Sequence, residues 1–182
     1  VLAGGTNMLI AFEQYPGIII HNTSSQYDLE DKTLYTQSGC SIWDIAEDLE
    51  EEHGIDLWHR FIGLPGSIGG AIYGNAGCFG LETENNFVSC TCLNMKSGHI
   101  VDIPKSEMKF SYRKSKLKKN RHLFCLSAEF DLSKKVEKYH SDVDNIHFRE
   151  NVQPNGLSCG SFFKNPSKQQ PAGKLIEEVG LK

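Results

Sequence analysis

The sequence of 182 residues predicts an α+β fold. Short extended segments dominate its first third and are separated by Gly, Pro, Asn and Asp, which are typical turn residues. Predicted strands outnumber predicted helices, and the two do not alternate strictly, which argues against a doubly wound parallel sheet. Apolar residues make up 39% of the chain, which is enough for the core of one medium domain or two small ones.

Strands and one clear helix are expected in the first third of the chain. We expect extended segments at residues 8–11, 18–21, 27–30 and 34–37. Ser41 can then cap a helix together with Asp44, three residues later. The apolar positions of this helix are Ile42, Ile45, Ala46 and Leu49. Gly54 follows them as a helix stop signal.

The remainder of the chain contains further strands and two more helices. Strands at 88–95 and 99–102 flank Lys96-Ser97-Gly98, which indicates a hairpin, and another strand is expected at 123–132. Apolar residues recur at helical spacing within 134–148. A short helix at 172–179 is expected to end at Gly180.

Composition and charge narrow the function classes. The net charge of −4 argues against general nucleic-acid binding, for which basic domains are typical. No apolar run reaches the roughly 18 residues that a membrane-spanning helix needs. No signal peptide precedes the first extended segment. We therefore expect a cytoplasmic protein that binds neither nucleic acid nor membrane.

The cysteines and histidines predict no metal site. A chain of this size does not need disulfides, so we expect six reduced thiols. They are Cys40, Cys78, Cys90, Cys92, Cys125 and Cys159. Cys90 and Cys92 would share one strand face, a spacing that does not suit a zinc knuckle. The seven histidines show no metal-ligand spacing.

Residues 63–80, GLPGSIGGAIYGNAGCFG, hold seven of the seventeen glycines. Glycine weakens a helix or strand by roughly 0.5 to 1 kcal/mol relative to alanine, so secondary structure does not explain this concentration. Both the Gly-x-Gly-x-x-Gly fingerprint and the phosphate loop ending in Gly-Lys-Ser/Thr are absent. The segment instead favours backbone N–H groups turned toward a polyanion such as a pyrophosphate, with Ser67 starting a helical turn beside it.

A second segment of the same kind is Gly4-Gly5-Thr6-Asn7, a turn between two apolar segments. The alternative for the longer segment is structural. Residues 66–80 would then pack tightly against another element, or Gly70 and Gly74 would form a helix contact.

Residues 159–166, CGSFFKNP, combine a hydroxyl, a cation and an amide. These groups can donate protons or hydrogen bonds to an anionic substrate. The alternative is a surface turn with Phe162 and Phe163 anchored in the core. The overlapping residues 156–160 match the hydrolase pattern Gly-x-Ser-x-Gly around Ser158. Turn signals on both sides replace the strand and helix which that motif needs, so a serine hydrolase is the least favoured interpretation.

Residues 111–121, SYRKSKLKKNR, are strongly basic, and most of their lysines are expected in a solvated loop. Arg113 differs because it lies between Tyr112 and Ser115. There its guanidinium group could be held so that it binds a carboxylate through two hydrogen bonds.

Together, these segments resemble the family of UDP-N-acetylenolpyruvoylglucosamine reductases, flavoenzymes that complete UDP-N-acetylmuramate synthesis for bacterial peptidoglycan. Residues 4–7 are similar to the family's G-G-[ST]-N turn, and residues 63–70 with 75–77 to its long flavin loop. Tyr112-Arg113-x-Ser115 is similar to its Y-R-x-S motif, and residues 160–166 to its G-S-x-F-K-N-P motif. Residues 172–182 fit the helix that follows, so the resemblance covers nearly the whole chain in the right order.

The resemblance implies an FAD-binding fold of the vanillyl-alcohol-oxidase/PCMH type, followed by the start of a substrate-binding α+β domain. Residues 1–20 would end the first FAD-binding subdomain and 21–148 would form the second. Residues 149–182 would begin the substrate-binding domain. The implied reaction reduces UDP-N-acetylglucosamine enolpyruvate to UDP-N-acetylmuramate, with hydride from NADPH passing through FAD. The reaction also implies a bacterial source.

The resemblance also implies roles for individual residues. Ser161 would be the proton donor, and Arg113 would stabilise charge that develops on the substrate carboxylate. Tyr112, Lys164 and Asn165 would bind substrate, with Asn165 near the diphosphate. The implied FAD-binding residues are Gly4, Gly5, Thr6, Asn7, Gly63, Pro65, Gly66, Ser67, Gly69, Gly70, Asn75, Ala76 and Gly77.

Two features depart from the family pattern. Arg113 and Ser161 are too close in sequence for the substrate-covering insertion of one subgroup, so the chain resembles the subgroup without it. The family's catalytic glutamate is expected after Lys182 and its first strands before Val1, so we expect a chain truncated at both ends and impaired as a fragment. A flavin-binding module without reductase activity is the alternative interpretation.

Overall fold

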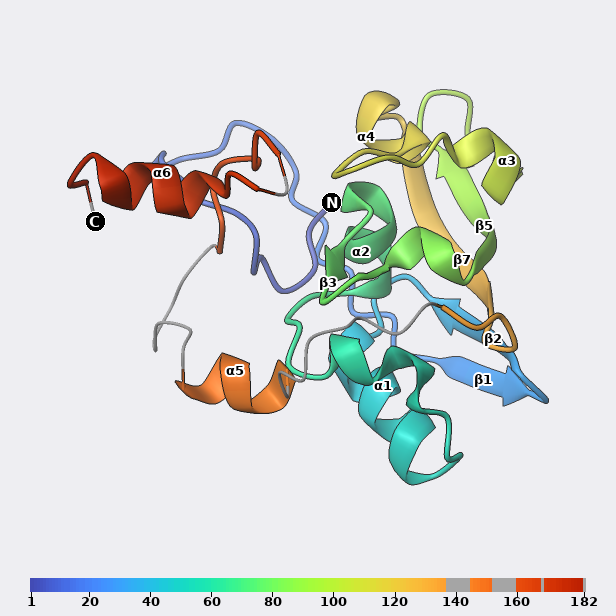
Figure 1. The fold of residues 1–182 in the computed structure, drawn as a ribbon. Coiled ribbons are helices and arrows are strands. Elements are labelled where there is room, and N and C mark those ends of the chain that lie inside the picture. Colours follow the sequence, from blue (N-terminus) through green and yellow to red (C-terminus); the bar gives the residue numbers. More distant parts are fainter. Residues whose placement is uncertain (137–144, 152–159, 168, 182) are drawn as a thin grey trace.

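The computed structural model describes residues 1–136, 145–151, 160–167 and 169–181. The described residues confirm the predicted α+β class, with an antiparallel sheet and helices that do not alternate with its strands (Figure 1). The strands are β1 (Tyr27–Glu30), β2 (Thr33–Gln37), β3 (Gly77–Cys78), β4 (Leu81–Glu82), β5 (Phe87–Asn94), β6 (Ile100–Pro104) and β7 (Leu123–Asp131). The helices are α1 (Ile42–Glu51), α2 (Ile68–Gly74), α3 (Lys105–Met108), α4 (Lys116–Lys119), α5 (Asn145–Asn151) and α6 (Ala172–Glu178), with 3-10 turns η1 (Asp56–Phe61) and η2 (Thr83–Asn85).

The main sheet has the strand order β1-β2-β7-β5-β6, and every neighbouring pair is antiparallel. The helices α2, α3 and α4 pack on strands β2, β5, β6 and β7. β3 and β4 form a separate two-stranded hairpin. Among the described residues, no helix is long and apolar enough to cross a membrane.

The predicted hairpin, the strands predicted at 27–30 and 34–37, and the first helix are confirmed. β1 pairs with β2, and β5 pairs with β6 on either side of the Lys96-Ser97-Gly98 turn. In α1, the Ser41 hydroxyl accepts the Asp44 N–H at 3.2 Å, which satisfies one of the free donors at the start of the helix. Gly54 follows the helix with φ +64°, a conformation that glycine adopts without strain.

An aromatic cluster fills the core beneath the sheet. The Trp58 ring lies 5.0 Å from the Phe130 ring and 5.4 Å from the Phe61 ring, both edge to face. Phe87 contacts Phe130 on the neighbouring strand at 5.8 Å. These four side chains are almost fully buried, and burying each one contributes on the order of 1.5 to 3 kcal/mol to folding.

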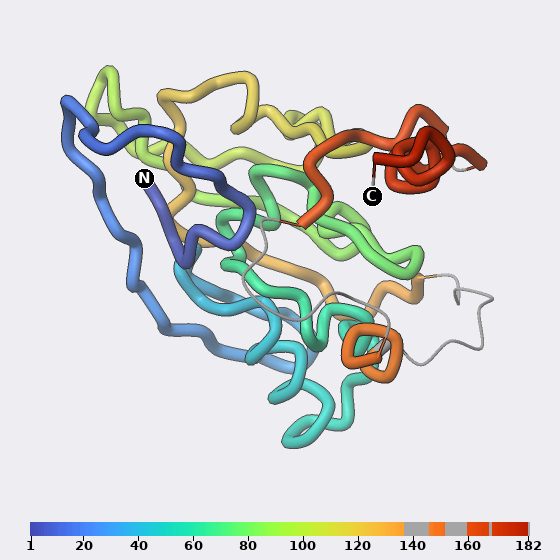
Figure 2. The backbone as a smooth tube through the Cα atoms, turned by 90° about the vertical axis from the view of Figure 1, so that its left-hand side faces the viewer, coloured from blue at the N-terminus to red at the C-terminus, as the bar shows by residue number. Residues whose placement is uncertain are grey.

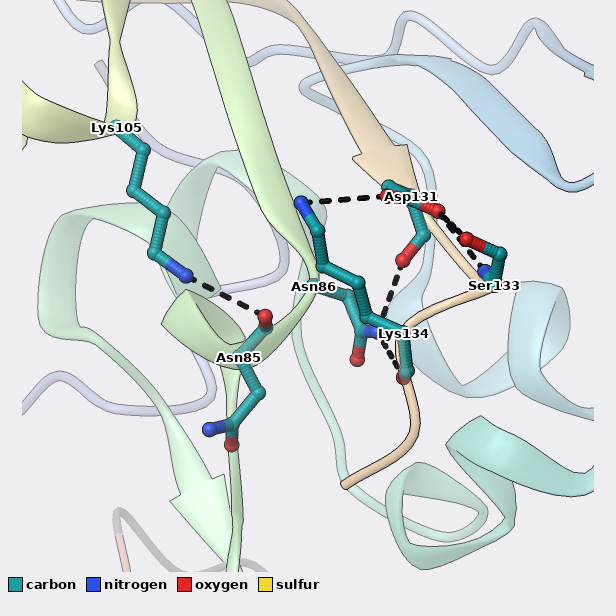
Figure 3. A network of polar contacts seen from close by, with 6 residues as sticks. All are labelled: Asn85, Asn86, Lys105, Asp131, Ser133 and Lys134. Atoms are coloured by element: carbon teal, nitrogen blue, oxygen red, sulfur yellow. Dashed lines mark hydrogen bonds and ion pairs between the residues drawn. The ribbon is translucent and has the colours of Figure 1, made fainter.

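A polar network fixes the end of β7 against the start of β5 (Figure 3). The Asn86 side chain donates to the carbonyl oxygens of Asp131 at 3.0 Å and Lys134 at 3.2 Å. The Ser133 hydroxyl and then the Ser133 N–H donate to the Asp131 carboxylate, which lowers the pKa of that carboxyl group. Lys134 pairs with the same carboxylate at 3.2 Å. The chain therefore turns at 131–134.

This turn corrects the helix predicted over 134–148. Residues 134–136 are not helical, because Asp131 accepts the Ser133 N–H and Asn86 donates to the Lys134 carbonyl oxygen, which holds the chain in a turn. Residues 137–144 lie outside the described part, and α5 begins at Asn145 and ends at Asn151, beyond the predicted end. The last helix, α6, is confirmed, and Gly180 follows it with φ +74°.

Two predicted strands are wrong. Residues 8–11 and 18–21 form no regular strand, apart from one bridge between Leu2 and His21. Ladder hydrogen bonds define a strand, and here they are limited to the two around that bridge, from Leu2 N–H and Asn22 N–H. Apolar side chains of the segment, such as Leu9 and Ile18, are largely exposed. Figure 2 shows the segment as the blue tube along one side of the molecule.

The basic segment 111–121 contains a helix that was expected to be loop. The Ser115 hydroxyl accepts the Lys118 N–H and starts α4, while Leu117 is buried beneath it. One apolar residue and one N-cap were enough to fold a single turn here, although the lysines around them are solvated.

Candidate functional site

The structure brings the two glycine-containing loops together. Residues 4–7 form an exposed turn in which Gly5 has φ +70°. From this turn, the Thr6 hydroxyl donates to the Pro65 carbonyl oxygen at 3.3 Å. A side chain placed at Gly66 would come within 3.5 Å of the same hydroxyl. Segments 59 residues apart in sequence therefore share one surface.

The glycines of this surface serve two different purposes. A Cβ atom at Gly69 would lie 3.0 Å from Ser38, and one at Gly77 would lie 2.9 Å from the Leu81 carbonyl oxygen, so both positions are glycine because of packing. This agrees with the structural alternative for those two residues. A Cβ atom at Gly70 would contact only the Ser67 hydroxyl, and one at Gly66 only the Thr6 hydroxyl, both at the ordinary contact distance of 3.5 Å. Gly66 also has φ +134°, a conformation that favours glycine. Gly66 and Gly70 are therefore free for the approach of a ligand.

Ser67 starts α2, as predicted, because its hydroxyl accepts the Gly70 N–H at 3.2 Å. The next two N–H groups are also used inside the protein: Ile68 donates to Cys40 and Gly69 donates to Ser38. Within the described part of the chain, the N–H groups of Gly66 and Ser67 have no acceptor. These two donors can bind an anion without breaking an existing bond.

Gly63 closes the start of this loop against the distant helix α5. It has φ +77°, and an added Cβ atom would lie 2.6 Å from the Arg149 side chain. The Arg149 guanidinium group stacks 5.2 Å from the centre of the Phe79 ring and donates to the Cys78 sulfur. Burial raises the pKa of the Cys78 thiol, and the Arg149 charge offsets part of that rise.

Asn75 links the end of α2 to two carboxyl groups. It is buried in a left-handed conformation with φ 45°. Its amide nitrogen donates to Glu82 at 2.8 Å and to Glu84 at 3.3 Å, and its amide oxygen accepts the Glu84 N–H at 3.1 Å. Burial, followed by the hydrogen bond and charge of Glu84, raises the pKa of Glu82. Ala76 beside it accepts the N–H and hydroxyl of Thr83.

Arg113 reaches back to the end of the glycine-rich loop. It lies in a tight turn with φ +56°, closed by two hydrogen bonds between Ser111 and Lys114. Its guanidinium group donates to the carbonyl oxygens of Gly77 at 3.0 Å and Asn75 at 3.4 Å. Tyr112 is 45% exposed and stacks 5.5 Å from the same guanidinium group. The Arg113 side chain is only part-buried, so the remaining guanidinium donors can still bind a carboxylate.

The C-terminal candidates lie at the periphery of the molecule. Ser161, Lys164 and Asn165 are exposed, and Asn165 accepts the Ala172 N–H at 3.0 Å in front of α6. Phe162 and Phe163 pack on each other at 5.2 Å but are 72% and 59% exposed, so they are not anchored in the core. In Figure 1 this segment stands apart from the main sheet. Ser158, the hydrolase candidate, lies outside the described residues.

Sequence reasoning missed Glu82, Glu84 and Thr83, which hold the loop end that Arg113 contacts. Two acidic residues just after a glycine-rich segment gave no distinguishing signal. Their importance follows from burial of Asn75, which the sequence pattern did not reveal.

Two family models match parts of the chain that contain the segments described above. Residues 1–104 match the family model described as an FAD binding domain. Residues 153–182 match the model described as the UDP-N-acetylenolpyruvoylglucosamine reductase C-terminal domain.

Individual relatives carry the same description. The chain is 34% identical over 190 residues to the UDP-N-acetylenolpyruvoylglucosamine reductase of Bacillus subtilis (strain 168), covering 100% of this chain and 61% of the relative. It is 33% identical over 187 residues to that of Fervidobacterium nodosum, covering 100% and 59%. The chain thus spans about three fifths of the length of these relatives.

A solved structure is similar as well. The crystal structure of the UDP-N-acetylenolpyruvylglucosamine reductase from Thermus caldophilus superposes with a TM-score of 0.72 at 25% identity. The match covers 100% of this chain and 66% of that one.

Proposed function

Because the chain belongs to the family of UDP-N-acetylenolpyruvoylglucosamine reductases, whose FAD-binding domain it carries, we propose that the protein acts in peptidoglycan precursor synthesis. In this proposal it reduces UDP-N-acetylglucosamine enolpyruvate to UDP-N-acetylmuramate, with NADPH as the hydride donor. It acts in the bacterial cytoplasm.

One observation carries the proposal. The Arg113 guanidinium group is bound to the carbonyl oxygens of Asn75 and Gly77, at the end of the same loop whose Gly66 and Gly70 leave room for a ligand. A residue expected to bind a substrate carboxylate is therefore tied to the loop expected to bind FAD. This arrangement favours a reaction between a bound flavin and an anionic substrate.

The residues present fit FAD at the glycine loops. The N–H groups of Gly66 and Ser67 would hold its pyrophosphate, with the turn at 4–7 beside them. When bound, FAD supplies hydride transfer between a nicotinamide and the substrate. The domain division follows the same proposal: residues 1–20 and 21–148 belong to the FAD-binding subdomains, and 149–182 begin the substrate-binding domain.

The chain's own residues would bind the substrate and move one proton. Arg113 stabilises the charge that develops on the substrate carboxylate, and Tyr112 covers it. Ser161 donates its hydroxyl proton to the substrate carbon next to the one that accepts hydride. A serine hydroxyl is a weak acid, but a carbanion-like centre held in contact is basic enough to take its proton. Lys164 and Asn165 bind the diphosphate end of the substrate.

The first test is whether the purified protein contains flavin. Its visible spectrum, followed by heat release and identification of the cofactor, should give FAD at about one per chain. A colourless protein that does not take up added FAD would sink the proposal.

The second test separates the two half-reactions. Ser161→Ala should lower substrate-dependent NADPH oxidation by about 100-fold or more, while NADPH still reduces the bound flavin. Normal turnover by this variant would remove Ser161 from the proton-donor role. Arg113→Gln should raise KM and lower kcat, and Lys114→Gln, which changes the exposed neighbouring cation, is the matched control.

A further inference from the structure

Three thiols meet on the helix-covered face of the main sheet. Cys90 and Cys92 come from β5 and Cys125 comes from β7, and all three are at most 4% exposed. Their sulfur atoms all lie within 4.8 Å of one another, and those of Cys90 and Cys92 are 3.6 Å apart. All three are free thiols rather than disulfides. The Met108 sulfur from α3 lies 4.0 Å from the Cys90 sulfur and adds a thioether to the cluster.

A bulge in the sheet creates this cluster. Thr91 pairs with Ser127, but the next residue, Cys92, pairs with Cys125, so β7 has one extra residue at this point. Side chains that are two residues apart share a face in a regular strand, whereas Cys125 and Ala128 are three apart and both buried. Without the extra residue, Cys125 would face away from Cys90 and Cys92.

The bulge is held by a specific contact. Ser38 is buried, and its N–H donates to the Leu126 carbonyl oxygen at 2.8 Å. Its hydroxyl donates to the Cys125 carbonyl oxygen at 2.6 Å. Bulges of this kind often redirect one side chain toward a functional site. The third sulfur is thus placed by a fixed backbone feature rather than by a flexible rotamer.

The spacing of the sulfur atoms suits one metal ion. With metal–sulfur bonds of about 2.3 Å, sulfur atoms around a three- or four-coordinate ion are about 4 Å apart. The observed separations, from 3.6 Å to no more than 4.8 Å, bracket that value. The ligand set contains only thiols and a thioether, with no imidazole or carboxylate. Soft sulfur ligands of this kind suit monovalent copper, zinc and iron–sulfur clusters. The Met108 thioether favours copper among these, because zinc sites in proteins use thiolate, imidazole and carboxylate ligands.

We propose that Cys90, Cys92, Cys125 and Met108 form a buried site for a single Cu(I) ion that stabilises the contact between the sheet and α3. Each thiol that becomes a ligand exchanges its S–H bond for an S–Cu bond and releases a proton to solvent, so no electrons are transferred. The site lies on elements β5, β7 and α3 (Figure 1), and Ser38 connects it to the glycine-rich loop through its hydrogen bonds with Cys125 and Gly69.

The test is an anaerobic titration of the reduced protein with Cu(I) against a chromophoric Cu(I) chelator. We expect one Cu(I) per chain, X-ray absorption showing sulfur ligands only, and a higher unfolding temperature for the copper-loaded protein. Cys92→Ser should remove tight binding, and Met108→Leu, which conserves volume, should weaken it while leaving the circular dichroism spectrum unchanged.

Matched controls are available in the same chain. Cys40→Ser changes a buried thiol outside the cluster, and Cys78→Ser changes the half-buried one, so both should bind copper as the wild type does. Cys92→Ala provides a second variant in case serine disturbs the core. The proposal is overturned if the wild type binds no Cu(I) in competition with the chelator, if Cys92→Ser and Cys92→Ala bind it equally well, or if Cys40→Ser or Cys78→Ser abolishes binding.

Discussion

Two neighbouring glycines of α2 allow packing to be separated from ligand binding. A Cβ atom at Gly69 meets the Ser38 side chain and carbonyl oxygen at 3.0 Å, while one at Gly70 meets only the Ser67 hydroxyl at 3.5 Å. Alanine stabilises a helix by roughly 0.5 to 1 kcal/mol relative to glycine, and overpacking a tight contact costs about 1 to 3 kcal/mol. Gly69→Ala should therefore lower the free energy of unfolding by about 1 to 2 kcal/mol. Gly70→Ala should raise it by about 0.5 to 1 kcal/mol.

Stability and FAD binding should change in opposite directions in the Gly70→Ala variant. Gly70→Ala fills space that we assign to the approach of the flavin, so it should weaken FAD binding by about tenfold or more even though the protein is more stable. Urea unfolding and FAD titration by fluorescence quenching measure the two quantities separately. Gly74→Ala is the control, because a Cβ atom there meets nothing within 4 Å. If Gly70→Ala bound FAD as tightly as the wild type, the open space above α2 would not belong to the cofactor.

Three further predictions concern polar contacts. Asn75→Ala should destabilise the protein by about 1 to 3 kcal/mol in thermal unfolding, because it leaves Glu82 and the Glu84 N–H without their partner; no loss would refute this role. The pKa of Glu82 is raised in the folded protein, so ionisation of this carboxyl group costs stability as pH rises above the ordinary glutamate pKa of 4.5. Glu82→Gln should therefore lose less stability than the wild type between pH 4 and 7, and equal losses would contradict this prediction. Asn86→Ala should cost about 1 to 2 kcal/mol in urea unfolding, since two hydrogen bonds, including the one to Asp131, are lost; an unchanged midpoint would show that the turn holds without them.

Features with local signals could be predicted from the sequence. The helix cap at Ser41, the cap at Ser67 and the Lys96-Ser97-Gly98 hairpin depend on residues within a few positions of one another, and the structure has all three. The strands predicted at 8–11 and 18–21 failed because a strand also needs a partner, which residue type alone does not supply. The family motifs likewise named Arg113 but gave no sign that its side chain binds the carbonyl oxygens of Asn75 and Gly77.

The glycine-rich loop shows why composition alone could not divide its residues by role. Gly69 and Gly70 are adjacent and both belong to the first turn of α2, yet the helix turns one toward Ser38 and the other toward open space. The hydrogen bond from the Gly69 N–H to the Ser38 carbonyl oxygen sets the rotation of α2, so that Gly69 rather than Gly70 faces Ser38. The same Ser38 also holds the β7 bulge through Cys125, so one buried serine sets both the orientation of the predicted cofactor loop and the third thiol of the sulfur cluster. A change at Ser38 would therefore disturb both sites at once, and this coupling follows from contacts between residues about 30 and 90 positions apart, which no local pattern records.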